Sequence, residues 1–156
     1  MTKAVTATEM YRVYKDAQKN FNKTHSNGDC ITMLSAYGVY KAVGGTRALS
    51  LASHKFSTEK ARLTAEKKYR VYIDYVYDFT TFYAKIAHEE FNYKWKLKEL
   101  IGKKYRRLID PKMNSNDAQL IMKAMLESEL TPNSERNVVE ALLVAAKSLY
   151  DKASNK

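Results

Sequence analysis

Apolar positions near the start of the chain repeat at the spacing of one face of an α-helix. The series recurs every three or four residues and comprises Met10, Val13, Tyr14, Ala17 and Phe21. This period predicts an amphipathic helix, and Thr6 with Glu9 just before it matches a capping box. We expect the helix to end within residues 25–28, where Gly28 can adopt the left-handed conformation that a turn requires.

Two further short helices are expected before residue 57. Asp29 is placed to cap the first of them, whose apolar positions are Ile31, Leu34, Tyr37 and Tyr40. The pair Gly44 and Gly45 should end this helix, because adjacent glycines mark turns. Thr46 can then cap a short third helix whose apolar positions are Leu49, Leu51 and Ala52.

The middle of the chain predicts one long helix over roughly residues 58–109. Residues 57–110 contain no Pro and only one Gly, Gly102. Pro111 should end the segment, because the residue before a proline resists the α region. Apolar residues recur at helical spacing throughout, although their stripe drifts around the axis. So long a helix either breaks near residues 87–93 or projects and packs on other subunits.

Residues 71–79 carry a competing signal. They are rich in β-branched and aromatic residues, the composition favoured in strands, and apolar residues fill both faces. We expect a helix nevertheless, because no turn residue lies within reach on either side to form a hairpin.

The C-terminal third predicts a pair of helices. Residues 114–117 form a loop that supplies a cap, and the helix that follows should end near Leu130. Thr131 before Pro132 then marks the start of the second helix of the pair. The apolar face of this second helix includes Val138, Val139, Leu142, Leu143 and Ala146. The sequence therefore predicts an all-α fold, a bundle of about five to seven helices with one long central helix. We expect a single domain over residues 1–156: short helices in 1–56, the long basic and aromatic helix in 57–110, and the helical pair in 114–156.

The composition narrows the class of protein. A length of 156 residues suits one domain, and 5 Gly with 2 Pro are too few for a turn-rich β-sandwich. A single Cys excludes a disulfide framework within one chain. The first residues show no secretory signal, and the longest apolar run, 141–146, is far too short for a membrane span. We expect cytoplasmic synthesis, a soluble protein and no cofactor.

The charge is uneven along the chain. The net charge is +10, and most of it lies in residues 31–68 and 92–112, on either side of a mildly acidic, tyrosine-rich stretch. The second block interleaves cations with aromatic rings, and its candidate nucleic-acid contacts are Lys94, Trp95, Lys96, Lys98, Lys103, Lys104, Tyr105, Arg106 and Arg107. On a helix, Lys96, Lys103 and Arg107 share one face. Such rows can follow a phosphate backbone, and aromatic rings can stack on open bases. A solvated helix face with its aromatic residues in the core is the alternative.

The first basic block contains further candidate contacts, Lys67, Lys68 and Arg70, although a plain solubilising surface is the preferred interpretation of this block. Arg62 with Glu66, and Glu59 with Lys67, are spaced to pair along a helix, so part of this charge should be neutralised. The chain also has 12 Tyr. Tyrosine suits both a core and a surface buried on assembly, and the pattern leaves both interpretations open.

Catalytic signals are weak. His25, His54 and His88 are isolated, without the spacing of a helical metal site. An enzyme would need a pocket that gathers Asp74, Asp78 and His88. Residues 44–47 lack the lysine and spacing of a phosphate-binding loop, so a simple helix end is the preferred interpretation. We expect no enzymatic activity.

Two functional hypotheses follow from these features. The first is a self-associating, sequence-independent nucleic-acid-binding protein, in the manner of a structural nucleoprotein or virion coat protein that binds DNA or RNA mainly through phosphates. The second is a basic interaction module, an inhibitor or adaptor of viral or mobile-element origin, that docks on an acidic protein. Binding to an anionic membrane surface is a third, weaker option.

Overall fold

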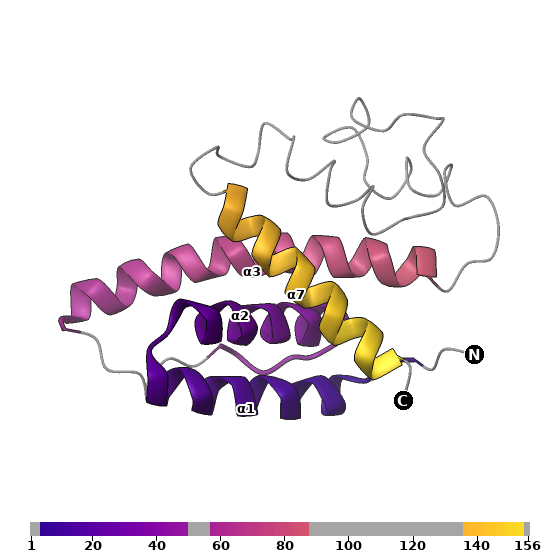
Figure 1. Cartoon of the computed structure of the whole chain (residues 1–156), viewed down its shortest axis with the longest axis horizontal. Helices are drawn as coiled ribbons and strands as arrows, with labels where there is room; N and C mark the ends of the chain where they lie inside the picture. The colour runs from indigo at the N-terminus through magenta and orange to yellow at the C-terminus, as the bar shows by residue number, and fades with distance from the viewer. Residues whose placement is uncertain (1–3, 50–56, 88–135, 155–156) are drawn as a thin grey trace.

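The computed structural model describes residues 4–49, 57–87 and 136–154, and most of these residues are helical (Figure 1). The helices are α1 (Ala7–Thr24), α2 (Asn27–Ala42), α3 (Glu59–Ala87) and α7 (Arg136–Ser154). These ranges contain no strand, so the predicted all-α class is confirmed for them. The predicted total of five to seven helices depends in part on residues outside these ranges.

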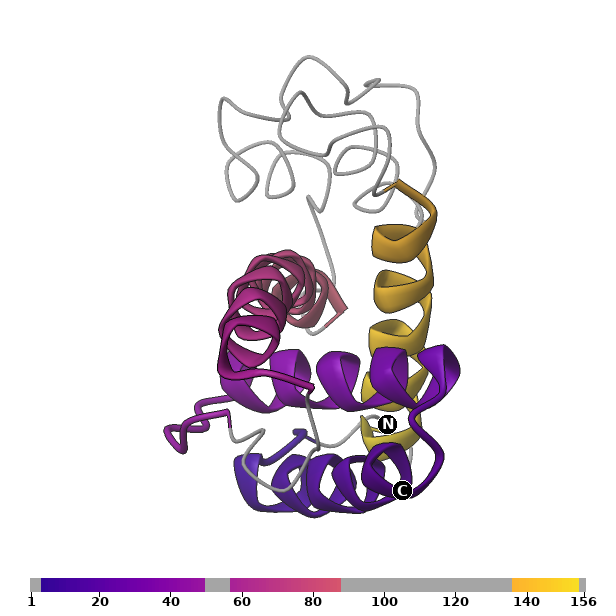
Figure 2. The same cartoon turned by 90° about the vertical axis from the view of Figure 1, so that its left-hand side faces the viewer.

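The central element of the described residues is α2. Helix α1 packs on one side of it and α3 on the other, while α7 crosses both α2 and α3 (Figures 1 and 2). Every residue from Met33 to Tyr40 is buried, as expected for a helix that is enclosed by others. The sequence placed the long helix over 58–109 at the centre. In its described part, α3 instead keeps one exposed face, because α2 is short, apolar on all sides and flanked by three partners.

The start of α1 agrees with the sequence prediction, and its C-cap lies in the range 25–28 where the helix was expected to end, but the left-handed residue there is not the glycine. Thr6 is the N-cap, and its side-chain oxygen accepts a hydrogen bond from the Glu9 backbone N–H at 3.2 Å. The left-handed residue at the end is His25, with φ of 55°, rather than Gly28. The His25 N–H donates to the Phe21 carbonyl at 2.8 Å, so the turn is closed three residues earlier than the glycine suggests.

Helix α2 begins earlier than predicted. Ser26 is its N-cap, and the Ser26 Oγ accepts from the Asp29 backbone N–H at 3.1 Å. The same hydroxyl donates to the Asp29 carboxylate at 3.0 Å, which makes Asp29 the acidic partner in the first turn rather than the cap. Gly28 consequently lies inside the helix. The prediction that Asp29 caps this helix is therefore wrong, because the helix begins one turn earlier, where Ser26 accepts from the Asp29 N–H.

The segment after α2 is extended rather than helical. Gly44 takes a φ of +104° and ends the helix, but residues 45–49 form no helix. The prediction that Thr46 begins a short helix is wrong for these residues, while Leu51 and Ala52 lie outside the described ranges. Two tyrosines explain the difference. The Arg47 N–H donates to the Tyr40 hydroxyl at 2.8 Å, and the Tyr37 hydroxyl donates to the Arg47 carbonyl at 2.7 Å.

Helix α3 includes residues 71–79, so the helical prediction for this ambiguous window is confirmed. The reason is tertiary, since the aromatic and β-branched side chains of one face pack against α2 and α7. The buried residues of this face are Tyr72, Ile73, Tyr75, Val76 and Phe79. The predicted alternatives beyond Ala87, a break near residues 87–93 or a continuous helix to 109, fall almost entirely outside the described residues.

Helix α7 is tied to the rest of the core by two long-range polar contacts. The buried Ser35 hydroxyl donates to the Leu142 carbonyl at 3.0 Å, joining α2 to α7. The Tyr83 hydroxyl donates to the Asp151 carboxylate at 2.6 Å, joining α3 to α7. The predicted start of this helix at Thr131 and Pro132 lies outside the described residues.

Candidate nucleic-acid interface

The twelve predicted contact residues divide into two groups. Lys67, Lys68 and Arg70 lie on α3 within the described part of the chain. The other nine lie outside it, and they are Lys94, Trp95, Lys96, Lys98, Lys103, Lys104, Tyr105, Arg106 and Arg107. The geometry of the candidate site can therefore be built from its α3 portion.

The exposed face of α3 is cationic in its N-terminal half. Lys60, Lys67, Lys68 and Arg70 are all solvent-exposed. Lys67 and Arg70 are three residues apart, so they are neighbours on the helix surface. Neither forms a salt bridge with any residue of the described ranges, so both cations are available to a dissolved anion.

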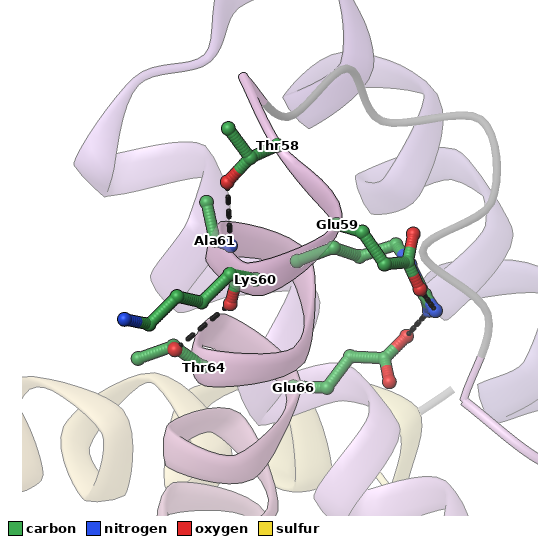
Figure 3. Close-up of polar contacts among 7 residues, drawn as sticks. Thr58, Glu59, Lys60, Ala61, Thr64 and Glu66 are labelled. Atoms are coloured by element: carbon green, nitrogen blue, oxygen red, sulfur yellow. Dashed lines mark hydrogen bonds and ion pairs between the residues drawn. The ribbon is translucent and has the colours of Figure 1, made fainter.

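Arg62 neutralises the acidic residues at the start of this helix. Its guanidinium binds both Glu59 and Glu66, and the Nη1 atom lies 2.7 Å from the Glu66 carboxylate (Figure 3). The hydrogen bond from Arg62 holds the pKa of Glu59 below its ordinary value, and the same contact raises the pKa of Arg62. The predicted pairing of Arg62 with Glu66 is confirmed, whereas Glu59 pairs with Arg62 rather than with Lys67.

This arrangement separates paired from unpaired charge on one helix. Glu59 and Glu66 reach toward the same side of α3, while Lys60 extends from another side (Figure 3). Both carboxylates are thus committed to Arg62 instead of screening the lysines. Lys67 and Arg70, further along the helix, keep their field in solvent.

Large apolar side chains accompany these cations. Leu63 is 53% exposed, Val71 is 51% exposed and Tyr77 is 40% exposed. Leu63, Lys67 and Arg70 follow one another at intervals of four and three residues, and Tyr77 comes seven residues after Arg70, so all four share one stripe of the helix. The exposed face therefore offers both charge and apolar contact area.

A polar hollow of about 340 Å³ borders the cationic face. Lys41 of α2 and Arg70 of α3 line it, together with the carboxylates of Glu66 and Asp74. Because both signs of charge are present, this hollow is a poor site for a phosphate. The hollow marks the edge of the cationic face on the side toward α2.

Arg47 is a functional candidate that the sequence pattern did not indicate. Its guanidinium lies 4.6 Å from the centroid of the Tyr11 ring, while its backbone is held by Tyr37 and Tyr40. No helix begins at Gly45. Residues 44–47 therefore follow the end of α2 as a loop that Tyr37 and Tyr40 hold in place, and they do not form a phosphate cradle. Only the tyrosine spacing on α1 and α2 could have signalled this contact.

No catalytic or metal-binding cluster occurs in the described ranges. They contain no group of three His, Cys, Asp or Glu side chains that could hold a metal ion. Asp74 is solvent-exposed on α3, and His88, the third member of the catalytic set considered from sequence, lies outside these ranges. None of the described helices is long and apolar enough to cross a membrane.

Comparisons with known proteins return no match: no family, no curated protein and no solved structure is significantly similar to this chain.

Proposed function

We propose that the protein is a non-enzymatic, sequence-independent nucleic-acid-binding protein that self-associates. The observation that carries the proposal is the exposed pair Lys67 and Arg70, which forms no salt bridge within the described residues, while Arg62 occupies the carboxylates of Glu59 and Glu66. Further along the chain lies segment 92–107, which is more basic than the described part of α3.

The binding mechanism is electrostatic. Lys67 and Arg70 each neutralise a phosphate and release its condensed counterions, and the arginine fork can contact two phosphate oxygens at once. No helix-turn-helix signature is present in the sequence to direct base readout. The proposal is therefore binding to the phosphate backbone, with Tyr77 as an exposed aromatic ring near the cations.

Self-association is supported by the apolar side chains on the same helix. Leu63, Val71 and Tyr77 expose large apolar area beside the cations, and tyrosine is enriched at protein interfaces. Contacts between copies bound side by side would cover this area and make binding cooperative. A structural nucleoprotein or coat protein of a virion has these two properties.

The experiment is a salt titration of binding to labelled single-stranded and double-stranded DNA and RNA, with light scattering on the same samples. The variant Lys67→Glu combined with Arg70→Glu should weaken binding and reduce the slope of log K against log salt by about 2, because each phosphate contact contributes about 1. Lys103→Glu combined with Arg107→Glu tests the second basic block in the same way.

A matched control comes from the opposite side of the molecule. Arg12 and Lys19 are exposed on α1, which packs on the other side of α2 (Figure 1). Arg12→Glu combined with Lys19→Glu changes the net charge equally and should alter binding much less. Absence of binding to every nucleic acid at low salt would contradict the proposal. A discrete complex with an acidic protein would then favour the interaction-module hypothesis, which the exposed Leu63 and Val71 also fit.

A further inference from the structure

A pocket of about 510 Å³ opens where α2, α3 and α7 meet. Its volume falls within the range of about 300–1,000 Å³ that is typical of small-molecule sites. The described lining residues come from all three helices and are Asn27, Cys30, Ile31, Leu34, Ala65, Lys68, Tyr69, Tyr72, Asn137, Val138, Ala141 and Leu142.

The walls of this pocket are mainly apolar. Leu34 and Leu142 belong to the buried core, and the side chains of Tyr69 and Tyr72 contribute aromatic surface from α3. Small side chains at Ala65 and Ala141 leave the space between the helices unfilled. An apolar ligand body would therefore gain burial without displacing a charged group.

The polar groups of the pocket favour a negative charge. Lys68 is the one cationic side chain among the described lining residues, and no Asp or Glu is among them. Its ammonium lies 5.8 Å from the centroid of the Tyr72 ring, alongside the apolar wall. Asn27 and Cys30 come from the first turn of α2, the positive end of the helix dipole.

Cys30 and Tyr69 keep their protons at physiological pH. Burial raises the pKa of the Cys30 thiol, although its hydrogen bond with the Tyr69 hydroxyl opposes this shift. Burial also raises the pKa of Tyr69 well above its ordinary range. Neither group repels an anion, and because Asp29 occupies the first turn of α2, Lys68 is the group in the described lining that favours a carboxylate.

We propose that this pocket binds a small amphiphile with an apolar body and one carboxylate, of the medium-chain fatty acid type. The apolar chain lies between Leu34, Tyr69 and Leu142, and the carboxylate pairs with Lys68 at the mouth. Lys68 is also one of the predicted nucleic-acid contacts, so the inference is tested in the absence of nucleic acid.

The experiment is isothermal titration of the full chain with decanoate, decanol and decyltrimethylammonium, each below its micelle concentration. Decanoate should bind at one site per chain and at least about tenfold more tightly than the cationic amphiphile, because a charged hydrogen bond contributes about this factor. Iodoacetamide modification of Cys30 gives a second readout. Decanoate should slow this modification, since Cys30 lines the pocket.

Two variants and two matched controls separate the pocket from general charge effects. Lys68→Met should weaken decanoate binding about tenfold and leave decanol unchanged, whereas Lys60→Met, an exposed position on the same helix outside the pocket, should do neither. Ala141→Phe should abolish binding of both by filling the space. Val144→Phe adds similar bulk at an exposed position of α7 and should bind normally.

Three outcomes would overturn the proposal. They are absence of decanoate binding, equal affinity for the anionic and cationic amphiphiles, and an equal loss of affinity in Lys60→Met and Lys68→Met. Circular dichroism of Ala141→Phe shows whether its helices are retained. If they are lost, the Lys68→Met comparison and the protection of Cys30 still decide the question.

Discussion

Tyrosine hydroxyls provide much of the polar bonding between the described helices and loops. Tyr37 donates to the Arg47 carbonyl at 2.7 Å, and Tyr83 donates to the Asp151 carboxylate at 2.6 Å. Inside α1, the Tyr14 hydroxyl accepts from the buried Gln18 amide at 3.2 Å. A buried ring whose hydroxyl is bonded gains apolar burial without an unsatisfied polar group. This accounts for part of the high tyrosine content within the fold itself.

At the scale of single residues, Cys30 should be a slow nucleophile. Burial raises its pKa above the ordinary value of 9.0, so little thiolate exists near neutral pH. Alkylation by iodoacetamide should be slower at pH 7.5 than for free cysteine, and the midpoint of its pH profile should lie above 9.0.

The Tyr69→Phe variant tests the cause of this behaviour. The hydrogen bond from Tyr69 lowers the pKa of Cys30, so its removal should move the midpoint further toward alkaline pH. A midpoint that falls, or a rate above that of free cysteine, would contradict this account.

Close contact between α2 and α3 depends on the absence of a side chain at Gly38. A Cβ atom at this position would lie 2.5 Å from the Val76 Cβ and still closer to its Cγ1. Val76 is itself fully buried, so it has no room to move away. The glycine therefore determines how near the two helices approach, and it does so in the middle of a helix, where glycine is otherwise unfavourable.

At the scale of helix packing, Gly38→Ala should destabilise the protein. Overpacking costs about 1–3 kcal/mol, which outweighs the gain of about 1 kcal/mol in helix propensity. We expect a net loss of about 1–2 kcal/mol in the free energy of unfolding, measured by urea denaturation.

Another glycine of the same helix is the control for this change. A Cβ atom added at Gly28, in the first turn of α2, would have no neighbouring atom within 4 Å, so Gly28→Ala should be neutral or stabilising. In a Val76→Ala background, the cost of Gly38→Ala should largely disappear. An equal cost in both backgrounds would rule out the contact with Val76 as its cause.

Positive charge lies on the surface of the molecule, whereas several groups that ionise at alkaline pH lie between its helices. Cations lie on the exposed surfaces of α1 and α3, while Cys30 and several tyrosines lie wholly or partly buried between helices. Burial raises the pKa of Tyr37, Tyr69 and Tyr150, and in Tyr150 the neighbouring Asp151 adds to the effect. Because these tyrosines come from α2, α3 and α7, and the Tyr37 ring lies 5.0 Å from the Tyr14 ring of α1, their ionisation affects interfaces of all four described helices.

At the scale of the whole molecule, stability should fall under alkaline conditions. The unfolded chain loses protons near pH 9.0 for Cys30 and near pH 10.0 for the tyrosines, whereas the folded state retains them to higher pH. Because the unfolded state then binds fewer protons, the free energy of unfolding decreases as pH rises. The contribution is fully present below pH 9.0 and is lost progressively above it.

Urea denaturation followed by circular dichroism between pH 7 and 11 measures this dependence. Absorbance at 295 nm on the same samples should show the buried tyrosines ionising together with unfolding. Constant or increasing stability from pH 9 to 11 would show that these groups ionise equally well in the folded state.

Local patterns in the chain were enough to predict the helical class, the start of α1 at Thr6 and the helical pairing of Arg62 with Glu66. These features depend on residues within one or two turns of each other, and such local interactions can be recognised from spacing. The helical state of residues 71–79 was also predicted, although their composition resembles that of a strand and packing against α2 and α7 stabilises the helix.

Contacts between elements determine which helix is central and what residues 45–49 do. The hydroxyls of Tyr37 and Tyr40 bind the backbone of Arg47, and Gly38 allows Val76 to approach α2. The pocket beside Lys68 requires three helices to meet. Each of these features joins groups from different elements or from beyond the next turn, and the periodicity of a single helix carries no information about which groups the fold brings together.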